Sequence, residues 1–199
     1  MSINVDPSRD PFEIFADALR AAEGTGIKDP NAMAVSSVGA DGRPSSRMVL
    51  LKDFDEHGFV FYTNYESRKG REIQANPNVC LHFFWRELGM QVLVEGPANP
   101  VSDEEADAYF ATRPHGSQVG AWASRQSRPL KGRAELLAAV AEVKLKHPGR
   151  VPRPPHWSGF RISPTRFEFW KDQPFRLHDR TAFARADASS PWETSKLFP

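Results

Sequence analysis

Three side chains that can carry positive charge follow one another at two-residue spacing near the carboxyl end: Arg176, His178 and Arg180. If residues 175–183 form a strand, these side chains share one face and lie about 7 Å apart. Such a row is unfavourable unless an anion or a ligand rich in hydrogen-bonding groups lies over it. The row therefore predicts a site for a polar ligand, although a solvated edge strand has the same pattern.

A second basic cluster, Ser67–Arg71, begins a helix that we predict to run to about Ala75. The helix dipole disfavours cations in the first turn, and a bound phosphate would reverse that penalty. A serine cap and flanking cations suit such an anion, although a solvated basic turn has the same composition. Upstream, Arg47 and Lys52 stand at the two ends of an apolar segment, from which each could reach around its rim.

A third cluster lies on the helix predicted to start at Ser102, which opens a capping box. Tyr109 and Arg113 are four residues apart and share a helix face, and Ser117 follows the break at Pro114. A phenol, a guanidinium and a hydroxyl together suit a phosphate monoester. Ordinary packing of a Tyr/Arg pair on a helix is the alternative interpretation.

Other kinds of site find little support in the sequence. The six histidines show no metal-ligand spacing, so we expect no metal site. No dinucleotide fingerprint, phosphate-binding loop or nucleophile elbow occurs. Lys and Arg total 26 against 25 Asp and Glu, a net charge of +1, which argues against an oligonucleotide-binding barrel and against membrane attraction.

The segments that would mark export or membrane insertion are also missing from the sequence. No apolar stretch approaches 18 residues, and residues 1–6 lack the pattern of a secretory signal. The single cysteine, Cys80, has no partner for a disulfide within one chain. We therefore expect a cytoplasmic protein.

Short apolar runs separated by turn signals dominate the chain and predict strands. We expect strands over 32–38, 46–52, 59–63, 79–85, 90–95, 160–162, 166–170, 175–183 and 192–197, and helices over 11–23, 67–75, 103–113 and 130–147. Strands and helices do not alternate, which favours an α+β fold dominated by an antiparallel β-barrel with peripheral helices. The length predicts one domain over residues 1–199, with residues 1–9 as a flexible amino-terminal arm.

Several separated motifs resemble the pyridoxamine 5′-phosphate oxidase family in order and spacing. They are Arg47–Lys52, Phe61–Asn64 with Ser67–Lys69, Gln91–Gly96, Tyr109–Pro114 with Ser117–Ser124, and Glu168–Trp170 followed by Arg176–Arg180. The resemblance covers nearly the whole chain beyond about Asp29. It implies a split β-barrel homodimer that binds FMN at the subunit interface.

The resemblance also implies two sets of binding residues and a catalytic pair. FMN contacts would fall on Arg47, Met48, Val49, Leu50, Leu51, Lys52, Tyr62, Thr63, Arg68, Lys69, Gln91, Gln126, Ser127, Trp170 and Arg180. Substrate contacts would fall on Lys52, Tyr109, Arg113, Ser117, Arg176 and His178. By implication Arg68 and Lys69 hold the FMN phosphate, whereas the substrate phosphate is held by Lys52, Tyr109, Arg113 and Ser117. We predict that Arg176 and His178 lie over the reacting side of the substrate ring and assist proton loss.

The reaction implied is oxidation of the 4′ carbon of pyridoxine or pyridoxamine 5′-phosphate to the aldehyde, with O2 consumed and H2O2 produced. One alternative is a related split-barrel flavin oxidase acting on another substrate, such as a phenazine precursor. The donors at Tyr109, Arg113 and Ser117 argue against a substrate without phosphate. The other alternative is an FMN-binding protein without catalytic activity.

Overall fold

The computed structural model describes residues 3–199, and β-strands dominate that range. The strands are β1 (Ala32–Val38), β2 (Pro44–Leu50), β3 (Asp53–Asp55), β4 (Gly58–Asn64), β5 (Asn78–Trp85), β6 (Met90–Pro100), β7 (Trp157–Ile162), β8 (Arg166–Lys171), β9 (Asp179–Ala184) and β10 (Glu193–Leu197). The helices are α1 (Pro11–Glu23), α2 (Arg68–Ala75), α3 (Asp103–Thr112), α4 (His115–Ala123) and α5 (Arg133–Lys146). This composition confirms the β-dominated α+β fold that the sequence predicts.

All paired strands are antiparallel, and they form one strongly curled sheet in the order β10-β9-β8-β6-β5-β1-β2. A branch of β3, β4 and β7 joins this path at β6. Residues 90–95 of β6 pair with β8, whereas residues 98–100 pair with β7. Gly96 lies between the two stretches, and a Cβ there would collide with the carbonyl of Ser163. The glycine therefore allows the close strand crossing that curls the sheet.

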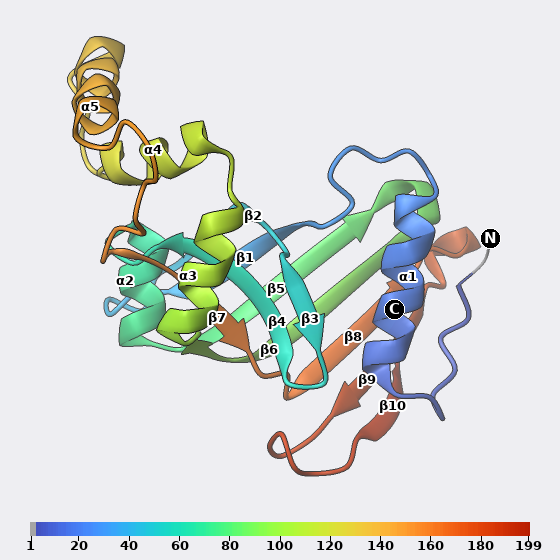
Figure 1. Ribbon diagram of the computed structural model, residues 1–199. Coiled ribbons are helices and arrows are strands. Elements are labelled where there is room, and N and C mark those ends of the chain that lie inside the picture. Colours follow the sequence, from blue (N-terminus) through green and yellow to red (C-terminus); the bar gives the residue numbers. More distant parts are fainter. Residues whose placement is uncertain (1–2) are drawn as a thin grey trace.

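Helix α1 covers the core at one end of the sheet (Figure 1). It begins as predicted, because Pro11 occupies its first turn and the Asp10 side chain accepts a hydrogen bond from the Phe12 N–H at 2.7 Å. Phe15 is fully buried and packs edge-on against Phe59, with ring centroids 4.8 Å apart. This packing fixes the end of the barrel that lies away from the candidate site.

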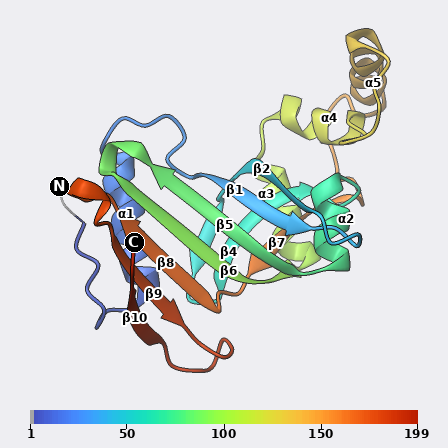
Figure 2. The same cartoon turned by 180° about the vertical axis from the view of Figure 1, so that it is seen from behind.

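The other helices lie at the periphery. Figure 1 shows α4 and α5 projecting from one end of the sheet, while β9, β10 and the carboxyl terminus lie toward the opposite end; Figure 2 shows the same arrangement from behind. Helix α2 caps the strand ends below α4. The sequence predicts α1, α2, α3 and α5 but not α4, which begins directly after Pro114.

The predicted strand over residues 175–183 is wrong in its first half. Residues 174–176 form a short 3-10 turn, and β9 starts only at Asp179. Pro174 has no N–H to give to a strand ladder, and Phe175 and Arg176 have φ values of 60° and 61°, in the left-handed region. Arg176, His178 and Arg180 therefore do not form a row on one strand face.

Two smaller observations complete the fold. Strand β2 ends at Leu50, so Leu51 and Lys52 follow the strand instead of belonging to it. Across residues 3–199 no helix combines the length and apolar character needed to cross a bilayer. The cytoplasmic location is a separate prediction from the sequence.

Candidate functional site

A pocket of about 480 Å³ opens between β2, the end of β4, the start of α2 and helix α4. Its volume lies in the range typical of small-molecule sites. The residues that line it are Met48, Val49, Leu50, Lys52, Tyr62, Thr63, Asn64, Lys69, Arg113, Ser117, Gly120, Ala121, Ser124, Gln126 and Trp157. Ten of these fifteen are among the site residues predicted from the sequence.

Arg113 is the residue of this pocket that most clearly needs a ligand as a hydrogen-bond partner. It follows the last turn of α3, and its guanidinium carbon lies 4.7 Å from the Trp157 ring centroid. Its Nη1 atom is buried, and among residues 3–199 it has no hydrogen-bond partner. Burial also lowers the pKa of the guanidinium. Because an unpaired buried donor is costly, the position favours an anion that would accept its hydrogen bond.

Aromatic rings support Arg113 from beneath. The rings of Tyr62 and Tyr109 stack with centroids 4.0 Å apart, and Tyr62 stacks on Trp157 at 5.3 Å. The Tyr62 hydroxyl donates to Glu105 Oε1 at 3.4 Å. Burial raises the pKa of the phenol, and the negative charge of Glu105 raises it further. Tyr109, predicted as a substrate contact, belongs to this stack but does not line the pocket.

Lys69 also lines the pocket, from the first turn of α2. Its Nζ donates to Thr63 Oγ1 at 3.0 Å and to Gln126 Oε1 at 3.1 Å. Burial, and then the charge of Arg47, lower its pKa to about 8. Because Lys69 is partly removed from water and lies near Arg47, a bound anion would stabilise its charged form.

The chain is locally built to hold α2 in this position. Ser67 caps the helix, its Oγ accepting from the Gly70 N–H at 3.2 Å. A Cβ at Gly70 would collide with the carbonyls of Asn64 and Tyr65, so only glycine allows the helix to approach the end of β4 this closely. This approach places Lys69 beside Thr63.

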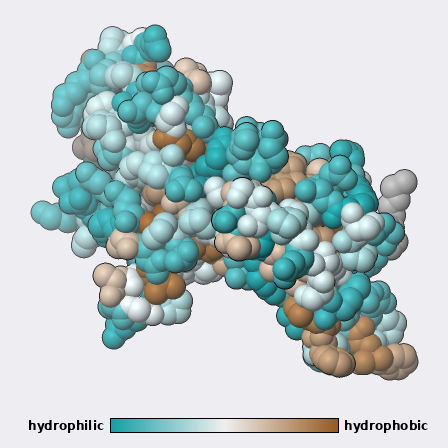
Figure 3. Space-filling model, turned by 90° about the horizontal axis from the view of Figure 1, so that it is seen from below, coloured by the Kyte–Doolittle hydropathy of each residue, from teal (hydrophilic) through white to brown (hydrophobic). Residues whose placement is uncertain are grey.

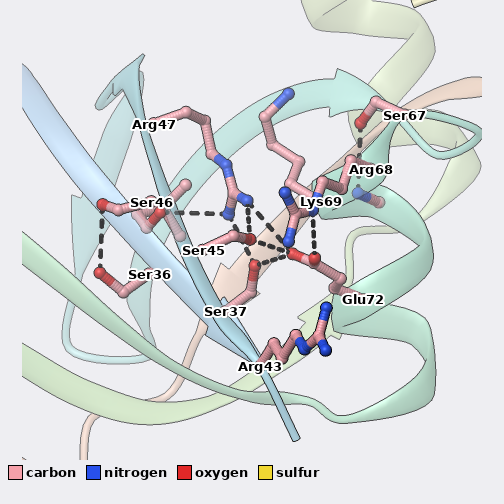
Figure 4. Close-up of polar contacts among 12 residues, drawn as sticks. Ser36, Ser37, Arg43, Ser45, Ser46, Arg47, Ser67, Arg68, Lys69 and Glu72 are labelled. Atoms are coloured by element: carbon pink, nitrogen blue, oxygen red, sulfur yellow. Dashed lines mark hydrogen bonds and ion pairs between the residues drawn. The ribbon is translucent and has the colours of Figure 1, made fainter. Parts of the chain in front are cut away.

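Arg47 and Arg68 lie beside Lys69 but do not line the pocket. Both donate to the carboxylate of Glu72, Arg47 through Nη2 at 3.1 Å and Arg68 through Nε at 2.7 Å (Figure 4). Ser37 and Ser45 complete the cluster by donating to the same carboxylate. Arg47 and Arg68 thus belong to a network built around one buried acid, whereas Lys69 is held by Thr63 and Gln126.

The other predicted site residues lie at the far end of the sheet, where β8 turns into β9 (Figures 1 and 2). The rings of Trp170 and His178 are 4.5 Å apart, and His178 Nδ1 lies 3.1 Å from Asp172 Oδ1. Arg180 is held by Glu168, with Nη2 2.6 Å from Oε1. None of these side chains lines the pocket.

This far end also carries exposed apolar side chains. Phe175 is 93% exposed, Leu177 is 67% exposed and Phe198 is 95% exposed. Seen from below, brown atoms gather at the end opposite to α5, and smaller brown areas lie between teal atoms elsewhere on this face (Figure 3). Arg176 is exposed in the same turn. The face is therefore suited to lie against another surface.

The structure divides the predicted residues into three groups. Met48, Val49, Leu50, Lys52, Tyr62, Thr63, Lys69, Arg113, Ser117 and Gln126 share the pocket, whereas Arg47, Leu51, Arg68, Tyr109 and Ser127 surround it without lining it. Gln91, Trp170, Arg176, His178 and Arg180 lie at the β8–β9 end. Within one chain the two candidate ends are therefore separate.

Sequence reasoning missed Glu72, Trp157 and Ser124. Glu72 had a usable signal, because it stands four residues after Arg68 on the same helix face. Ser124 ends the motif Ser117–Ser124 but has no contact assigned to it, and Trp157 is distant in sequence from the motifs it joins. Across the described part of the chain, no group of three or more His, Cys, Asp or Glu side chains is arranged to hold a metal.

The donor set fits a flavin mononucleotide in chemical type. Lys69 and the Nη groups of Arg68 offer cationic donors for a phosphate, and Gln126 offers an amide beside them. Residues 48–50, on the edge strand β2, line the same pocket. These groups could hold the phosphate and the ring system of such a cofactor.

Comparison with known sequences identifies the family. Residues 19–147 match the family model described as pyridoxamine 5′-phosphate oxidase, and residues 157–199 match the pyridoxine 5′-phosphate oxidase C-terminal dimerisation region. A pyridoxine/pyridoxamine 5′-phosphate oxidase of Azorhizobium caulinodans is 56% identical over 191 residues, which are 96% of this chain and 90% of that protein. One of Brucella canis is 55% identical over 193 residues, which are 96% of this chain and 95% of that protein.

Solved structures agree with the fold. PhzG from Burkholderia lata 383, in complex with tetrahydrophenazine-1-carboxylic acid, has a TM-score of 0.90 and 34% identity over 98% of this chain and 95% of that chain. A pyridoxamine 5′-phosphate oxidase-related, FMN binding protein from Nostoc punctiforme has a TM-score of 0.76 at 15% identity, covering 96% of this chain and all of that one. The similarity confirms the split β-barrel. The chain belongs to the pyridoxamine 5′-phosphate oxidase family of oxidoreductases.

Proposed function

We propose that this chain uses FMN to oxidise pyridoxine 5′-phosphate or pyridoxamine 5′-phosphate to pyridoxal 5′-phosphate, with O2 as the electron acceptor and H2O2 as a product. The observation that carries the proposal is the buried Nη1 of Arg113, which has no protein partner within residues 3–199. Lys52 and Ser117 line the same pocket. A guanidinium, an ammonium and a hydroxyl form a donor set for a phosphate ester, which explains why a phosphorylated vitamer fits this end.

In this proposal the cofactor phosphate lies against Arg68 and Lys69 at the start of α2, with Gln126 and Ser127 beside it. The flavin ring lies along Met48–Leu50 of β2. When bound, FMN would accept the two electrons removed from the substrate's 4′ carbon and pass them to O2. The protein's contribution is orientation, because anchoring both phosphates limits how the reacting groups can move.

We infer that a complete site needs two copies of the chain. Arg113 and Arg176 belong to opposite ends of one molecule, yet the substrate is expected to contact both. The match of residues 157–199 to a dimerisation region supports a homodimer, and the exposed apolar side chains at the β8–β9 end provide a surface for it. In the dimer, Arg176 and His178 of one chain would reach the pocket of the other.

We assign Arg176 and His178 to the reacting side of the substrate ring. A neutral His178 that carries its proton on Nδ1, which lies 3.1 Å from Asp172 Oδ1, would have its lone pair on Nε2. In that tautomer Nε2 is the nitrogen that would face the substrate and accept its proton. Gln91, Trp170 and Arg180 would lie against the flavin.

The test is to record the visible spectrum of the purified protein and then to follow aldehyde and peroxide formation in air from both phosphorylated vitamers. We expect a flavin spectrum, both products, and a strong preference over pyridoxine and pyridoxamine without phosphate. A protein that shows the flavin spectrum but forms neither product would contradict the proposal and would favour the FMN-binding protein without turnover.

The similarity to PhzG supports a second candidate, a flavin oxidase of a phenazine precursor. Such a substrate carries a carboxylate and no phosphate, so it would make less use of the donors at Arg113, Lys52 and Ser117. The same assay distinguishes the two candidates if a reduced phenazine carboxylic acid is included. Faster turnover of that compound than of the vitamer phosphates would favour the second candidate.

A further inference from the structure

Glu72 is an acid buried at the centre of a basic cluster. The first turn of α2 contains no acidic residue, and Glu72 lies one turn later, where it reaches back to Arg68. The residue is only 8% exposed. A buried carboxylate is retained only when charged partners and hydrogen bonds compensate for its lost hydration.

The partners of Glu72 are unusually complete. Oε2 accepts from Ser37 at 2.6 Å, from Ser45 at 2.5 Å and from Arg47 at 3.1 Å, and Oε1 accepts from Arg68 at 2.7 Å. Burial alone would raise the pKa of this carboxyl, but the four hydrogen bonds lower it to about 2. The carboxylate is therefore ionised and held from β1, β2 and its own helix (Figure 4).

The same contacts fix the two arginines differently. The Nη atoms of Arg47 donate to the Val35 carbonyl, Ser37, Ser45 and Glu72, so the guanidinium is held on four sides. Arg68 uses Nε for Glu72, and within the described residues neither of its Nη atoms has a partner. Glu72 thus leaves the outer edge of Arg68 directed to a ligand.

The charges also balance a phosphate. Arg47, Arg68 and Lys69 contribute three positive charges and Glu72 one negative charge, which leaves +2. A phosphate monoester carries about −1.5 to −2 at neutral pH. Without Glu72 the cluster would hold three cations around one dianion.

We propose that Glu72 is a positioning residue for the FMN phosphate: it holds Arg47 and Arg68 in the geometry that receives the phosphate without touching the cofactor. The inference rests on the proposed function, since it assigns the phosphate to the start of α2. In the opposite case, Glu72 would compete with the phosphate for the two arginines and would weaken FMN binding. The burial of Glu72 and its two serine donors argue against that case, because they prevent it from moving away.

The experiment is to titrate the flavin-free full-length chain with FMN and with riboflavin, which lacks the phosphate, and to follow flavin fluorescence. Glutamine has nearly the size of glutamate, but its amide NH2 group cannot accept the hydrogen bonds that the serines and arginines donate to the Glu72 carboxylate. We expect the Kd for FMN to rise about tenfold, which corresponds to ~1.4 kcal/mol, while the Kd for riboflavin stays within about twofold. Ser45→Ala removes one donor to Glu72 and should raise the Kd for FMN about threefold.

Asp17→Asn is the matched control. Asp17 also bridges two arginines, Arg9 and Arg20, each at 2.9 Å, but it lies on α1. We expect it to leave both affinities unchanged. Thermal unfolding of each variant without flavin shows that the protein is folded, and Ser45→Ala carries the test if Glu72→Gln does not fold.

Two results would overturn this inference alone. Equal losses of FMN and riboflavin affinity would reveal a structural role, and unchanged or tighter FMN binding in Glu72→Gln and Ser45→Ala would show that the carboxylate does not position the arginines. If the wild-type chain binds FMN no better than riboflavin, the phosphate assignment itself fails, and with it both this inference and the cofactor site in the proposed function.

Discussion

The pocket end and the β8–β9 end of the molecule are prepared for a ligand in different ways. At the pocket end, Lys69 and Arg113 are held by neighbours of the same chain, through Thr63 and Trp157. At the β8–β9 end, Arg176 is exposed in a turn with a left-handed backbone. The difference teaches that one chain preforms the proposed anion-binding residues, whereas the turn that carries Arg176 has few supporting neighbours within the same chain.

The backbone conformation at the β8–β9 end also costs free energy. A non-glycine residue in the left-handed region costs about 1 kcal/mol, and Phe175 and Arg176 both adopt it. Few contacts within the chain compensate, since Phe175 is almost fully exposed. Burial of Phe175 and Leu177 against a partner chain would offset that cost.

Arg113→Ala should have the largest effect, because it removes a charged donor at the preformed end. We expect kcat/KM for the phosphorylated vitamers to fall about 100-fold, equivalent to ~2.7 kcal/mol, and the preference over dephosphorylated vitamers to disappear. Steady-state kinetics on both forms check this. Arg133→Ala, an exposed arginine on α5, is the control, and a retained preference for the phosphate form in Arg113→Ala would be inconsistent with the assignment.

Arg176→Ala should be next in size. Loss of a charged hydrogen bond to the substrate is worth ~2 kcal/mol, so kcat/KM should fall about 30-fold. FMN affinity should stay unchanged, because the proposed site of the cofactor phosphate is at the pocket end. Arg86→Ala, an exposed arginine at the same end of the sheet, should have normal kinetics. Unchanged turnover in Arg176→Ala would remove this residue from the site.

The pH dependence of FMN binding tests the pocket end alone. The pKa of Lys69 in the free protein is about 8, lowered by burial and then by Arg47, and a bound phosphate would favour its charged form. FMN affinity should therefore be highest below pH 8 and fall as Lys69 loses its proton, by about tenfold between pH 7 and pH 9. Lys69→Met should flatten this profile. An equally steep profile in that variant would show that another group causes the pH dependence.

Trp157→Phe should have the smallest effect. The ring lies 4.7 Å from the Arg113 guanidinium, and a weaker cation–π contact costs roughly 0.5–1 kcal/mol. We expect KM for the phosphorylated vitamer to rise about threefold with kcat unchanged. Trp192→Phe weakens a similar contact with Arg185 far from the pocket and should leave KM at the wild-type value. A loss of kcat in Trp157→Phe would mean that the ring does more than support Arg113.

Local sequence signals predicted the starts of the helices well. Asp10, Ser67 and Ser102 cap their helices as expected, because capping depends on a few neighbouring residues. The cations at Arg68 and Lys69 pointed to an anion site in the first turn of α2. Short apolar runs separated by turn signals predicted the β-dominated fold, since turn residues mark where each short strand ends.

The β8–β9 end was predicted less well, for a physical reason. Residues 175–183 have strand-like composition, but Pro174 and the left-handed residues after it turn the chain before β9 begins. No local pattern shows that Arg176 would lie far from Arg113. That separation is a property of the whole sheet, and the sequence motifs alone place both residues in one site.

The most direct test of the central claim uses a heterodimer of Arg113→Ala and Arg176→Ala chains, co-expressed with two affinity tags and purified through both. If each site combines the pocket end of one chain with the β8–β9 end of the other, one site carries both substitutions and the second carries none. We then expect about half of the wild-type activity from two nearly inactive parents. A heterodimer as inactive as either parent would contradict the account, because it would place Arg113 and Arg176 of the same chain in one site.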